Sequence, residues 1–253
     1  MTGTVLTDNP AEGVRVITLN RPARLNAISP ELLEDLTREV NAANLDTAIR
    51  AIVLTGAGRA FCSGDDLKDF ESHLGSEEMV HAYVERIQDV TRAIVLGDKP
   101  VIGAIHGWAV GGGLEWMINC DFAIAAEGSR FFFPEVKWGL FVTGAVAALL
   151  PRMVGAQKTR ELIYFGECFD AAQALQWGML WKVVPHAQLL FEAIHIARRI
   201  AELPPAPVNA LKRILAHRLS SSMEEVMADE TAATVRGFLD PETGKRIASF
   251  GKS

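Results

Sequence analysis

The sequence lacks the features that mark membrane-spanning and exported proteins. No apolar run in the 253 residues approaches the ~20 consecutive residues that a membrane-spanning helix needs. Segment 1–8 has no basic region, no apolar stretch and no Arg-rich amphipathic pattern of a targeting signal. Cysteine is scarce, because Cys62, Cys120 and Cys168 are odd in number and far apart, as is typical of free thiols in a reducing compartment. These absences predict a cytoplasmic protein with no membrane partner.

An excess of positive charge is also missing. Asp and Glu number 31 against 25 Lys and Arg, which gives a formal net charge of −6 at pH 7. Nucleic acids attract proteins that carry an excess of Lys and Arg, so we expect no nucleic-acid partner. The 49% hydrophobic and 22% charged residues are ordinary for a globular protein. A chain of 253 residues can form one large domain, or a domain with an appendage, around a buried core.

Several common binding and catalytic motifs are absent. There is no Gly-x-Gly-x-x-Gly, and Gly111–Gly113 is not followed by the Lys-Ser/Thr of a phosphate-binding loop. No His-Glu-x-x-His or Cys-x-x-Cys pattern indicates zinc. The Gly-x-Ser-x-Gly of serine hydrolases is missing because Phe61-Cys62 precedes Ser63. The sequence therefore argues against a dinucleotide site, a phosphate-binding loop, a zinc site and a serine nucleophile.

Two other interpretations rest on single clusters. Asp65 and Asp66 could begin a metal site completed by Glu115 or Glu135, but hard cations usually need more clustered oxygen ligands. Cys62 could act as a nucleophile with His106 as its base, but a thiol among small residues is more often buried and inert. We favour neither and predict no metal ion.

Hydrophobic periodicity divides the chain into alternating strands and helices. Apolar runs predict strands over 14–20, 49–55, 101–105, 121–126, 130–135 and 179–184. Apolar stripes predict helices from Ser29 to Val40, from Met79 to Ile94 and, as two helices, over 207–239, and residues 170–173 have the form of a capping box. This alternation indicates an α/β protein. The proline-rich stretch 204–207 divides it into a core over 1–203 and a helical region over 204–253.

One stretch, from His106 to Glu115, combines the features of an anion-binding site. It follows the apolar run 101–105 and passes through Gly111–Gly113 into the start of a helix. Glycine lets a backbone approach a ligand closely, and the first turn of a helix presents N–H groups without partners at its positive end. Alone, the pattern also fits an ordinary turn with a surface Glu. A second glycine turn, Phe61–Asp66, strengthens the functional interpretation, because two turns can supply the pair of N–H groups that an enolate oxygen requires.

Two glutamates accompany these turns. Glu115 lies one turn inside the predicted helix, and Glu135 ends the predicted strand over 130–135. Burial can raise the pKa of a carboxyl toward neutrality, so two carboxyls near one site suit general acid–base catalysis. Taken alone, Glu135 after Pro134 also fits a surface acid at the end of a strand.

Three motifs stand at these places: FCSGDDL over 61–67, HGWAVGGGLE over 106–115 and FFFPE over 131–135. In combination they resemble the crotonase, or enoyl-CoA hydratase/isomerase, superfamily, and the resemblance extends from Val14 to the C-terminal helices. It implies an α/β fold built as a spiral of ββα repeats with a C-terminal helical trimerisation region. It also implies an acyl-CoA substrate, coenzyme A being part of that substrate rather than a separate cofactor, and self-association as a homotrimer or a dimer of trimers.

The resemblance also assigns residues to the site by motif position. The N–H groups that hold the thioester enolate are those of Asp65 and Gly112. The substrate-binding set is Arg24, Leu25, Ala27, Ala60, Ser63, Gly64, Asp66, Leu67, Gly111 and Thr143. Phe250 and Lys252 of a neighbouring subunit are candidates for holding the nucleotide end of coenzyme A.

The same resemblance suggests the reaction. Glu115 and Glu135, twenty residues apart, match the two carboxylates of hydratases, whereas isomerases commonly keep only the second. We therefore predict an enoyl-CoA hydratase-type lyase, in which Glu115 deprotonates the water that attacks Cβ and Glu135 protonates Cα. The alternatives are an enoyl-CoA double-bond isomerase of the same family, in which Glu135 acts, and a non-catalytic acyl-CoA-binding protein.

The sequence departs from the hydratase pattern in several positions. Where hydratases usually have a Pro-Gly-x-Gly-Gly-like run, segment 142–148 reads VTGAVAA, so that Thr143 replaces a glycine. Asp65 replaces a smaller residue, although only its N–H is required. Bulky side chains predict a reshaped acyl pocket that accepts a branched, cyclic or aromatic acyl group. They are those of Trp116, Phe132, Phe133 and Trp138.

Overall fold

In the computed structural model, which describes residues 3–66 and 76–249, the strands form two sheets. The larger sheet has the order β1-β2-β3-β4-β6-β9 and the smaller has the order β5-β7-β8. The strands are β1 (Val5–Ala11), β2 (Val14–Leu19), β3 (Ala51–Gly56), β4 (Val101–Ile105), β5 (Trp108–Val110), β6 (Phe122–Ala126), β7 (Arg130–Phe132), β8 (Phe169–Asp170) and β9 (Lys182–Val184).

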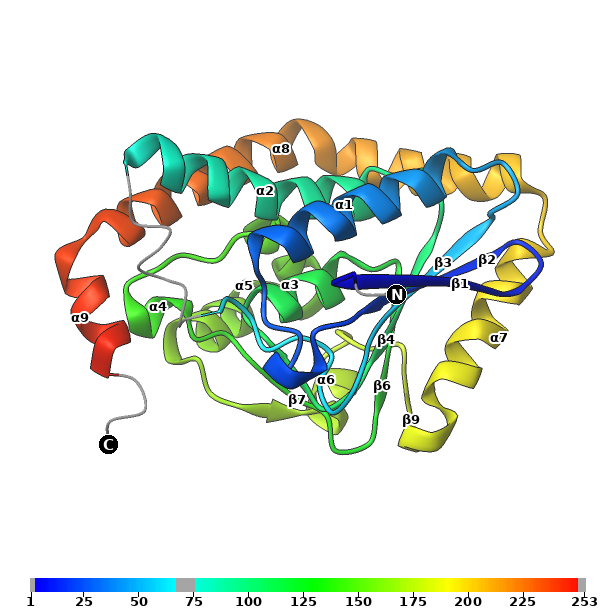
Figure 1. Ribbon diagram of the computed structural model, residues 1–253, viewed down its shortest axis with the longest axis horizontal. Coiled ribbons are helices and arrows are strands. Elements are labelled where there is room, and N and C mark those ends of the chain that lie inside the picture. Colours follow the sequence, from blue (N-terminus) through cyan, green and yellow to red (C-terminus); the bar gives the residue numbers. More distant parts are fainter. Residues whose placement is uncertain (1–2, 67–75, 250–253) are drawn as a thin grey trace.

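Helices cover both faces of the larger sheet (Figure 1). They are α1 (Pro30–Leu45), α2 (Glu77–Val95), α3 (Gly112–Asn119), α4 (Glu135–Trp138), α5 (Val146–Phe165), α6 (Ala171–Gln176), α7 (Leu189–Ala201), α8 (Pro205–Leu239) and α9 (Pro241–Ser249). Helix α1 packs beside α2, which in turn packs against α8, while α7 lies against β3 and β4 (Figure 1). None of the helices in the described part is both long and apolar enough to span a bilayer.

The larger sheet is parallel from β2 to β9. Because helices cover both faces, its strands are buried on both sides, which explains why β3 and β4 read as continuous apolar runs. Successive side chains point to opposite faces, so Val53 belongs to the core cluster beneath α7, whereas Leu54 belongs to the cluster beneath α1 and α2. The predicted α/β architecture is confirmed.

Strand β1 does not follow from the sequence pattern. Its central residues Asp8-Asn9-Pro10 are poor strand formers, and its side chains are half-buried or exposed. It forms because it pairs antiparallel with β2 at the edge of the sheet, where proline is tolerated. Gly13, with φ +74°, makes the intervening turn. Tertiary pairing overrides the local preference here.

Consecutive strands of the core alternate between the two sheets before each helix. In β4-β5-α3 and β6-β7-α4, the first strand lies in the larger sheet, the second in the smaller, and a helix follows. Segment 61–62 after β3 takes a similar place, since Cys62 forms a parallel bridge with Ala109 of β5. These stacked ββα turns confirm the predicted spiral, and they bring corresponding strand ends side by side.

The predicted helix starts are present. The hydroxyl of Ser29 accepts a hydrogen bond from the N–H of Leu32, and Pro30 is the first residue of α1. Asp170 and Gln173 form the predicted capping box of α6. The predicted stripe of α2 is buried except for Met79, which is 55% exposed.

The C-terminal region differs from its prediction. The sequence predicts two helices over 207–239, with the second capped near Ser222, but the structure has one continuous helix, α8. No proline or glycine interrupts the middle of this stretch, so nothing local breaks the helix there. The long helix lies along α2 and contacts α5, and it carries residues to the candidate site from far along the chain.

Candidate active site

The two glycine turns predicted to hold an enolate oxygen lie side by side. The N–H of Val110 donates to the carbonyl of Cys62 (3.0 Å), and the N–H of Cys62 donates to the carbonyl of Trp108 (3.1 Å). This pairing sets Gly64 against β5: a Cβ at Gly64, where φ is +82°, would lie 2.9 Å from the carbonyl oxygen of Val110. The close approach therefore requires glycine. Stacking of two ββα turns thus creates the site.

The second turn opens directly into α3. Gly111, with φ +52°, precedes this helix and accepts a hydrogen bond from the N–H of Glu115, and Gly112 is the first helical residue. A Cβ at Gly113 would lie 2.5 Å from the carbonyl oxygen of Cys62, so this position also excludes a side chain. Amide groups in the first turn have no acceptor within the helix, and the helix dipole makes them a favourable place for an anion.

Glu115 is held in position by a loop on the far side of the cavity. Its side chain is 1% exposed, and its carboxylate accepts hydrogen bonds from the N–H (2.8 Å) and the hydroxyl (2.6 Å) of Thr143. A Cβ at Gly144 would lie 2.7 Å from the Cβ of Glu115, which accounts for glycine there. Burial raises the pKa of Glu115 to about 7, the two bonds from Thr143 oppose that rise, and the charge of Asp65 adds to it.

Glu135 reaches the same cavity through strand pairing. Val110 of β5 lies opposite Phe132 of β7, and the N–H of Gly111 donates to the carbonyl of Phe132 (3.2 Å). The predicted strand ends at Phe132, so Glu135 is the first residue of the short helix α4 rather than the end of a strand. Its Oε2 is buried and has no hydrogen-bond partner among the described residues. An unpartnered buried carboxyl oxygen is costly to keep, which is characteristic of functional sites.

The two carboxyls differ in their proton affinity. Burial raises the pKa of Glu135 well above its usual value, and the negative charge of Glu115 raises it further. Glu115 receives two hydrogen bonds from Thr143, whereas a backbone hydrogen bond lowers the pKa of Glu135 only in part and its Oε2 has no partner among the described residues. When the pair holds one proton, these surroundings therefore favour Glu135 over Glu115 as its site. Two carboxyls with separated pKa values form an acid and a base in one site.

A small cavity joins these groups. Its volume is about 20 Å³, enough for roughly one water molecule. It is lined by Ile28, Asp65, Ile87, Gly112, Glu115, Glu135, Leu140, Phe141, Thr143, Thr234 and Phe238. The structure thus brings together the four predicted catalytic positions and Thr143.

Most of the other residues that line this cavity could not be predicted from the sequence. Thr234 and Phe238 come from α8 and Ile87 from α2, while Leu140 and Phe141 follow α4. The i,i+4 spacing of Thr234 and Phe238 indicates one helix face, but nothing local indicates that this face meets the glycine turns. These contacts arise only when α8 packs against the core.

Asp65 contributes more than its N–H group. Its carboxylate accepts a hydrogen bond from the hydroxyl of Tyr83 on α2 (3.0 Å), and the residue lines the cavity. Burial is the main cause of the raised pKa of Glu115 and of Glu135, and the charge of Asp65 raises both. The carboxylate of Asp65 therefore affects the site in addition to the N–H group, which alone was predicted to be required.

Asp65→Asn should move the pH–rate profile to lower pH. The variant keeps the backbone N–H but removes a negative charge, so the pKa values of both glutamates should fall. If turnover requires an ionised Glu115 and a protonated Glu135, the acid limb and the basic limb should both shift downward. Asp229→Asn, which removes an exposed acid on α8, serves as the control. An Asp65→Asn profile that coincides with that of the wild type would contradict the electrostatic role of this side chain.

The predicted coenzyme A residues form one strip beside the first glycine turn. The N–H of Ser63 donates to the carbonyl of Leu25 (3.1 Å), and the N–H of Ile28 donates to the carbonyl of Gly64 (2.9 Å). Asp66 pairs with Arg21 at 3.4 Å. The structure therefore joins the first loop to the first glycine turn by backbone hydrogen bonds, and the binding of coenzyme A along them stays a prediction.

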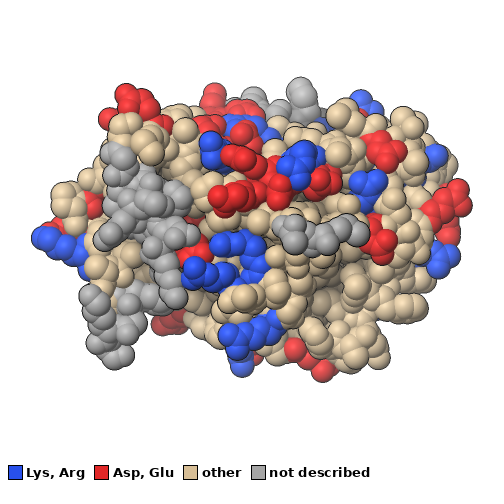
Figure 2. All heavy atoms as spheres, in the orientation of Figure 1, with Lys and Arg blue, Asp and Glu red and all other residues tan. Residues whose placement is uncertain are grey.

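The remaining members of that set differ in their accessibility. Ala27 and Ala60 are buried, and the carbonyl of Ala60 accepts a hydrogen bond from the side chain of Asn26 (2.8 Å), so neither lines the cavity. Arg24 is exposed. Figure 2 shows Lys and Arg side chains gathered over the connection between β2 and α1, which carries Arg21 and Arg24. Leu67, Phe250 and Lys252 lie outside the described residues.

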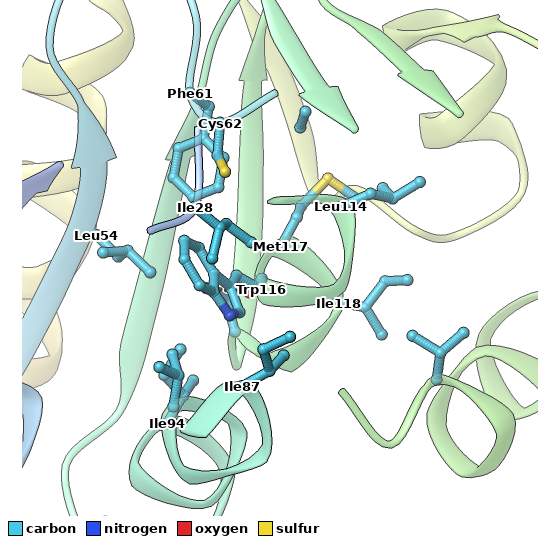
Figure 3. Packing of buried hydrophobic residues seen from close by; sticks show 14 of the residues in the cluster. Ile28, Leu54, Phe61, Cys62, Ile87, Ile94, Leu114, Trp116, Met117 and Ile118 are labelled. Carbon is cyan, nitrogen blue, oxygen red and sulfur yellow. Dashed lines mark hydrogen bonds between the residues drawn. The ribbon is translucent and has the colours of Figure 1, made fainter. Parts of the chain in front are cut away.

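The bulky residues predicted to reshape the acyl pocket mostly belong to the core. Trp116 is fully buried, and Figure 3 shows its ring in the hydrophobic core with Ile28 and Ile87 beside it. Phe133 is also buried in this core, and Trp138 packs against it. None of the predicted four lines the cavity. Their position in the sequence near the motifs was therefore misleading, because proximity along the chain did not place them in the cavity wall.

The weaker interpretations gain no support. Burial raises the pKa of the Cys62 thiol to about 12, so it does not supply a thiolate near neutral pH. Within residues 3–66 and 76–249, no group of three or more His, Cys or acidic side chains is arranged to hold a metal ion.

Comparisons with known proteins agree with this geometry. Residues 9–242 match the family model described as enoyl-CoA hydratase/isomerase. A Rhizobium meliloti protein named "Probable enoyl-CoA hydratase" is 32% identical over 237 residues, covering 94% of this chain and 91% of the relative. The 1,2-epoxyphenylacetyl-CoA isomerase of Escherichia coli is 35% identical over 206 residues, covering 81% of this chain and 79% of the relative.

Solved structures lead to the same family. The crystal structure of an enoyl-CoA hydratase/isomerase from Pseudoalteromonas atlantica has a TM-score of 0.89 and 29% identity, and the match covers 98% of this chain and 97% of that one. The chain belongs to the enoyl-CoA hydratase/isomerase family of the crotonase superfamily. It is an enzyme of this family, which leaves the non-catalytic alternative without support.

Proposed function

We propose that the protein is a hydratase-type lyase that adds water to a 2-enoyl-CoA thioester or removes it from a 3-hydroxyacyl-CoA. One observation carries this proposal: Glu115 and Glu135 line the same small cavity as Gly112 at the start of α3. Syn addition of water requires a base near Cβ and an acid near Cα on the same face of the substrate double bond. The water-sized volume of the cavity supports the same reaction.

The mechanism divides the proton transfers between the two carboxyls. The thioester oxygen accepts hydrogen bonds from the N–H groups of Asp65 and Gly112, which stabilise negative charge as the enolate forms. Glu115 removes a proton from the water whose oxygen bonds to Cβ. Glu135 delivers its proton to Cα. After this step Glu115 is protonated and Glu135 is ionised. Dehydration follows the same steps in reverse.

Coenzyme A is the carrier portion of the substrate and lies along the strip formed by residues 24–27 and 63–66. Its phosphates are anionic, so the basic side chains over the connection between β2 and α1 support this placement (Figure 2). The acyl end lies against Leu140, Phe141 and Phe238. Two aromatic rings in this wall support a branched, cyclic or aromatic acyl group.

A panel of 2-enoyl and 3-enoyl thioesters tests the reaction type. Mass spectrometry should detect the addition of one water to at least one 2-enoyl-CoA. An isomerase changes the absorbance of the substrate without a change in mass. The double-bond isomerase remains the second candidate because the family model is described as enoyl-CoA hydratase/isomerase. A shift of the double bond with no water added would overturn the hydratase proposal in favour of this one.

Family membership also supports a proposal for the assembly. The C-terminal helical region, 204–253, joins subunits into a homotrimer or a dimer of trimers, with the core over 1–203. Leu211, Ile214 and Leu215 of α8 are 57–60% exposed, and apolar residues grouped this way support burial against a partner. Multi-angle light scattering distinguishes the two assemblies from a monomer. The enzyme acts in the cytoplasm, a location that its three free cysteines support.

A further inference from the structure

A third buried glutamate lies behind the catalytic pair. Glu230 of α8 is 1% exposed, and its Oε1 accepts a hydrogen bond from the N–H of Ala147 (2.9 Å). Its Oε2 accepts from the N–H of Ala145 (2.9 Å) and from the side-chain amide of Gln88 on α2 (3.4 Å). Three donors converge on this carboxyl from two other elements. Burying a carboxyl costs free energy of desolvation, so its presence here calls for an explanation.

The carboxyl of Glu230 caps the N-terminus of α5, which has no capping side chain of its own. Ala145 precedes the first residue of α5 with φ +55°, and no side chain of its own caps the helix. Glu230 therefore supplies, from 85 residues further along the chain, the acceptor that an N-cap residue normally provides. Gln88 extends this arrangement, because its side-chain oxygen accepts from the N–H of Gly144 (3.2 Å).

The capped loop is the one that holds the catalytic base. Thr143, adjacent to Gly144, donates both of its hydrogen bonds to Glu115. The carbonyl of Gly144 accepts from the side chain of Asn119 on α3 (2.8 Å). Segment 143–147 is thus fixed to α3 on one side and to α2 and α8 on the other. It is also the segment in which the glycine-rich run of hydratases is missing.

We propose that Glu230 is a positioning residue that fixes segment 143–147 and thereby keeps Thr143 bonded to Glu115. Glu230 on the long helix α8 orders the loop 142–148, VTGAVAA. The N-cap residue of α5 in this loop, Ala145, has no capping side chain. The inference rests on the proposed role of Glu115 as the base.

Substitution of Glu230 tests the proposal. Glu230→Met has a side chain of similar size but accepts none of the three hydrogen bonds. Without them the loop should shift, and a displacement of about 1 Å should lower kcat on the order of 100-fold. Glu230→Gln keeps one acceptor oxygen but points an amide at an N–H donor, so its loss should be smaller. Burial raises the pKa of Glu230 to about 8, with Glu115 adding to the rise, so kcat is compared at a pH above 8. Glu225→Gln, an exposed glutamate on the same helix, should behave like the wild type.

The pH profile separates positioning from a merely structural role. The hydrogen bonds from Thr143 lower the pKa of Glu115, so loss of this contact should raise that pKa and move the acid limb of kcat to higher pH. The acids that face Glu115 are Asp65, Glu135 and Glu230. Because burial raises the pKa of Glu230 to about 8, its replacement removes little negative charge at the pH where Glu115 titrates, and the lost Thr143 bonds set the direction of the shift. Thr143→Val, which removes the hydroxyl, should move the limb in the same direction. A lower melting temperature with an unmoved acid limb and normal kcat would overturn the proposal.

A titration without turnover keeps the two hypotheses distinct. Carbon-13 NMR of glutamate side-chain carboxyls, with Glu115 assigned through Glu115→Gln, reports its pKa in the free protein. Glu230→Gln and Glu230→Met should shift this pKa upward, whereas Glu225→Gln should not. If the wild type hydrates no thioester, the proposed function fails while this titration still decides the inference. If the wild type hydrates and the Glu115 titration is unchanged in both Glu230 variants, the inference alone fails.

Discussion

Replacing Glu135 by Gln should reduce hydration by about 100- to 10,000-fold, the usual contribution of a general acid or base. The amide has no proton of suitable acidity to give to Cα, although its size is unchanged. Because the same carboxyl moves the Cα proton in both directions, exchange of that proton with deuterated water should be lost together with hydration. Both are measured on the same acyl-CoA, by product formation and by the deuterium content of Cα.

The control for this substitution is Glu127→Gln, an exposed glutamate between β6 and β7. It should retain both activities. Retained Cα exchange in Glu135→Gln, with hydration lost, would contradict the assigned role, because another group would then move the proton. Binding of a saturated acyl-CoA should persist in the variant, since Glu135 is not in the coenzyme A strip.

Replacing Gly112 by Pro should lower kcat by about 100- to 1000-fold through the loss of one oxyanion N–H. Proline is tolerated at the first position of a helix, and the N–H it removes has no acceptor within α3, so the fold should persist. The expected signature is a lower kcat with little change in the melting temperature, measured by steady-state kinetics and calorimetry.

Steric effects need a matched variant at the same position. A Cβ at Gly112 would lie 2.6 Å from the terminal methyl of Ile28, a flexible side-chain end that must move. Gly112→Ala imposes this contact but keeps the N–H, so it should be markedly more active than Gly112→Pro. Equal activity of the Ala and Pro variants would show that crowding, not the missing donor, causes the loss. A folded Gly112→Pro with near-normal turnover would contradict the oxyanion assignment.

The division of labour between Glu115 and Glu135 has a structural cause. Glu115 is fastened by Thr143, which stabilises its charged form, whereas Glu135 has a buried oxygen without a partner. Two chemically identical side chains thereby become a base and an acid within one cavity. Under the proposed mechanism the identity of residue 143 therefore matters, although Thr143 itself transfers no proton.

Features that depend on neighbours in the sequence could be predicted. Helix α1 begins where Ser29 and Pro30 indicate, α6 has its capping box, and the buried strands β3 and β4 read as apolar runs. The glycine turns at 64 and 111–113 were also recognisable, since close backbone contacts tolerate no Cβ there. These features depend on residues that are close together in the sequence, so the sequence pattern alone indicates them.

Features that depend on distant contacts could not be predicted. Strand β1 forms against its local preferences, α8 is one helix rather than two, and Trp116 points into the core rather than the cavity. The cavity wall and the cap of α5 come from α8, whose side chains meet these elements only after folding.

By itself, the sequence determined the alternation of strands and helices in the core, the glycine turns and the presence of two carboxyls in family motifs. Only the tertiary structure decided which carboxyl keeps its proton and what holds the base. Those properties are set by burial and by hydrogen bonds such as that between residues 143 and 115, which are 28 positions apart. A pKa is a property of the surroundings of a group, and the chain creates those surroundings only when it folds.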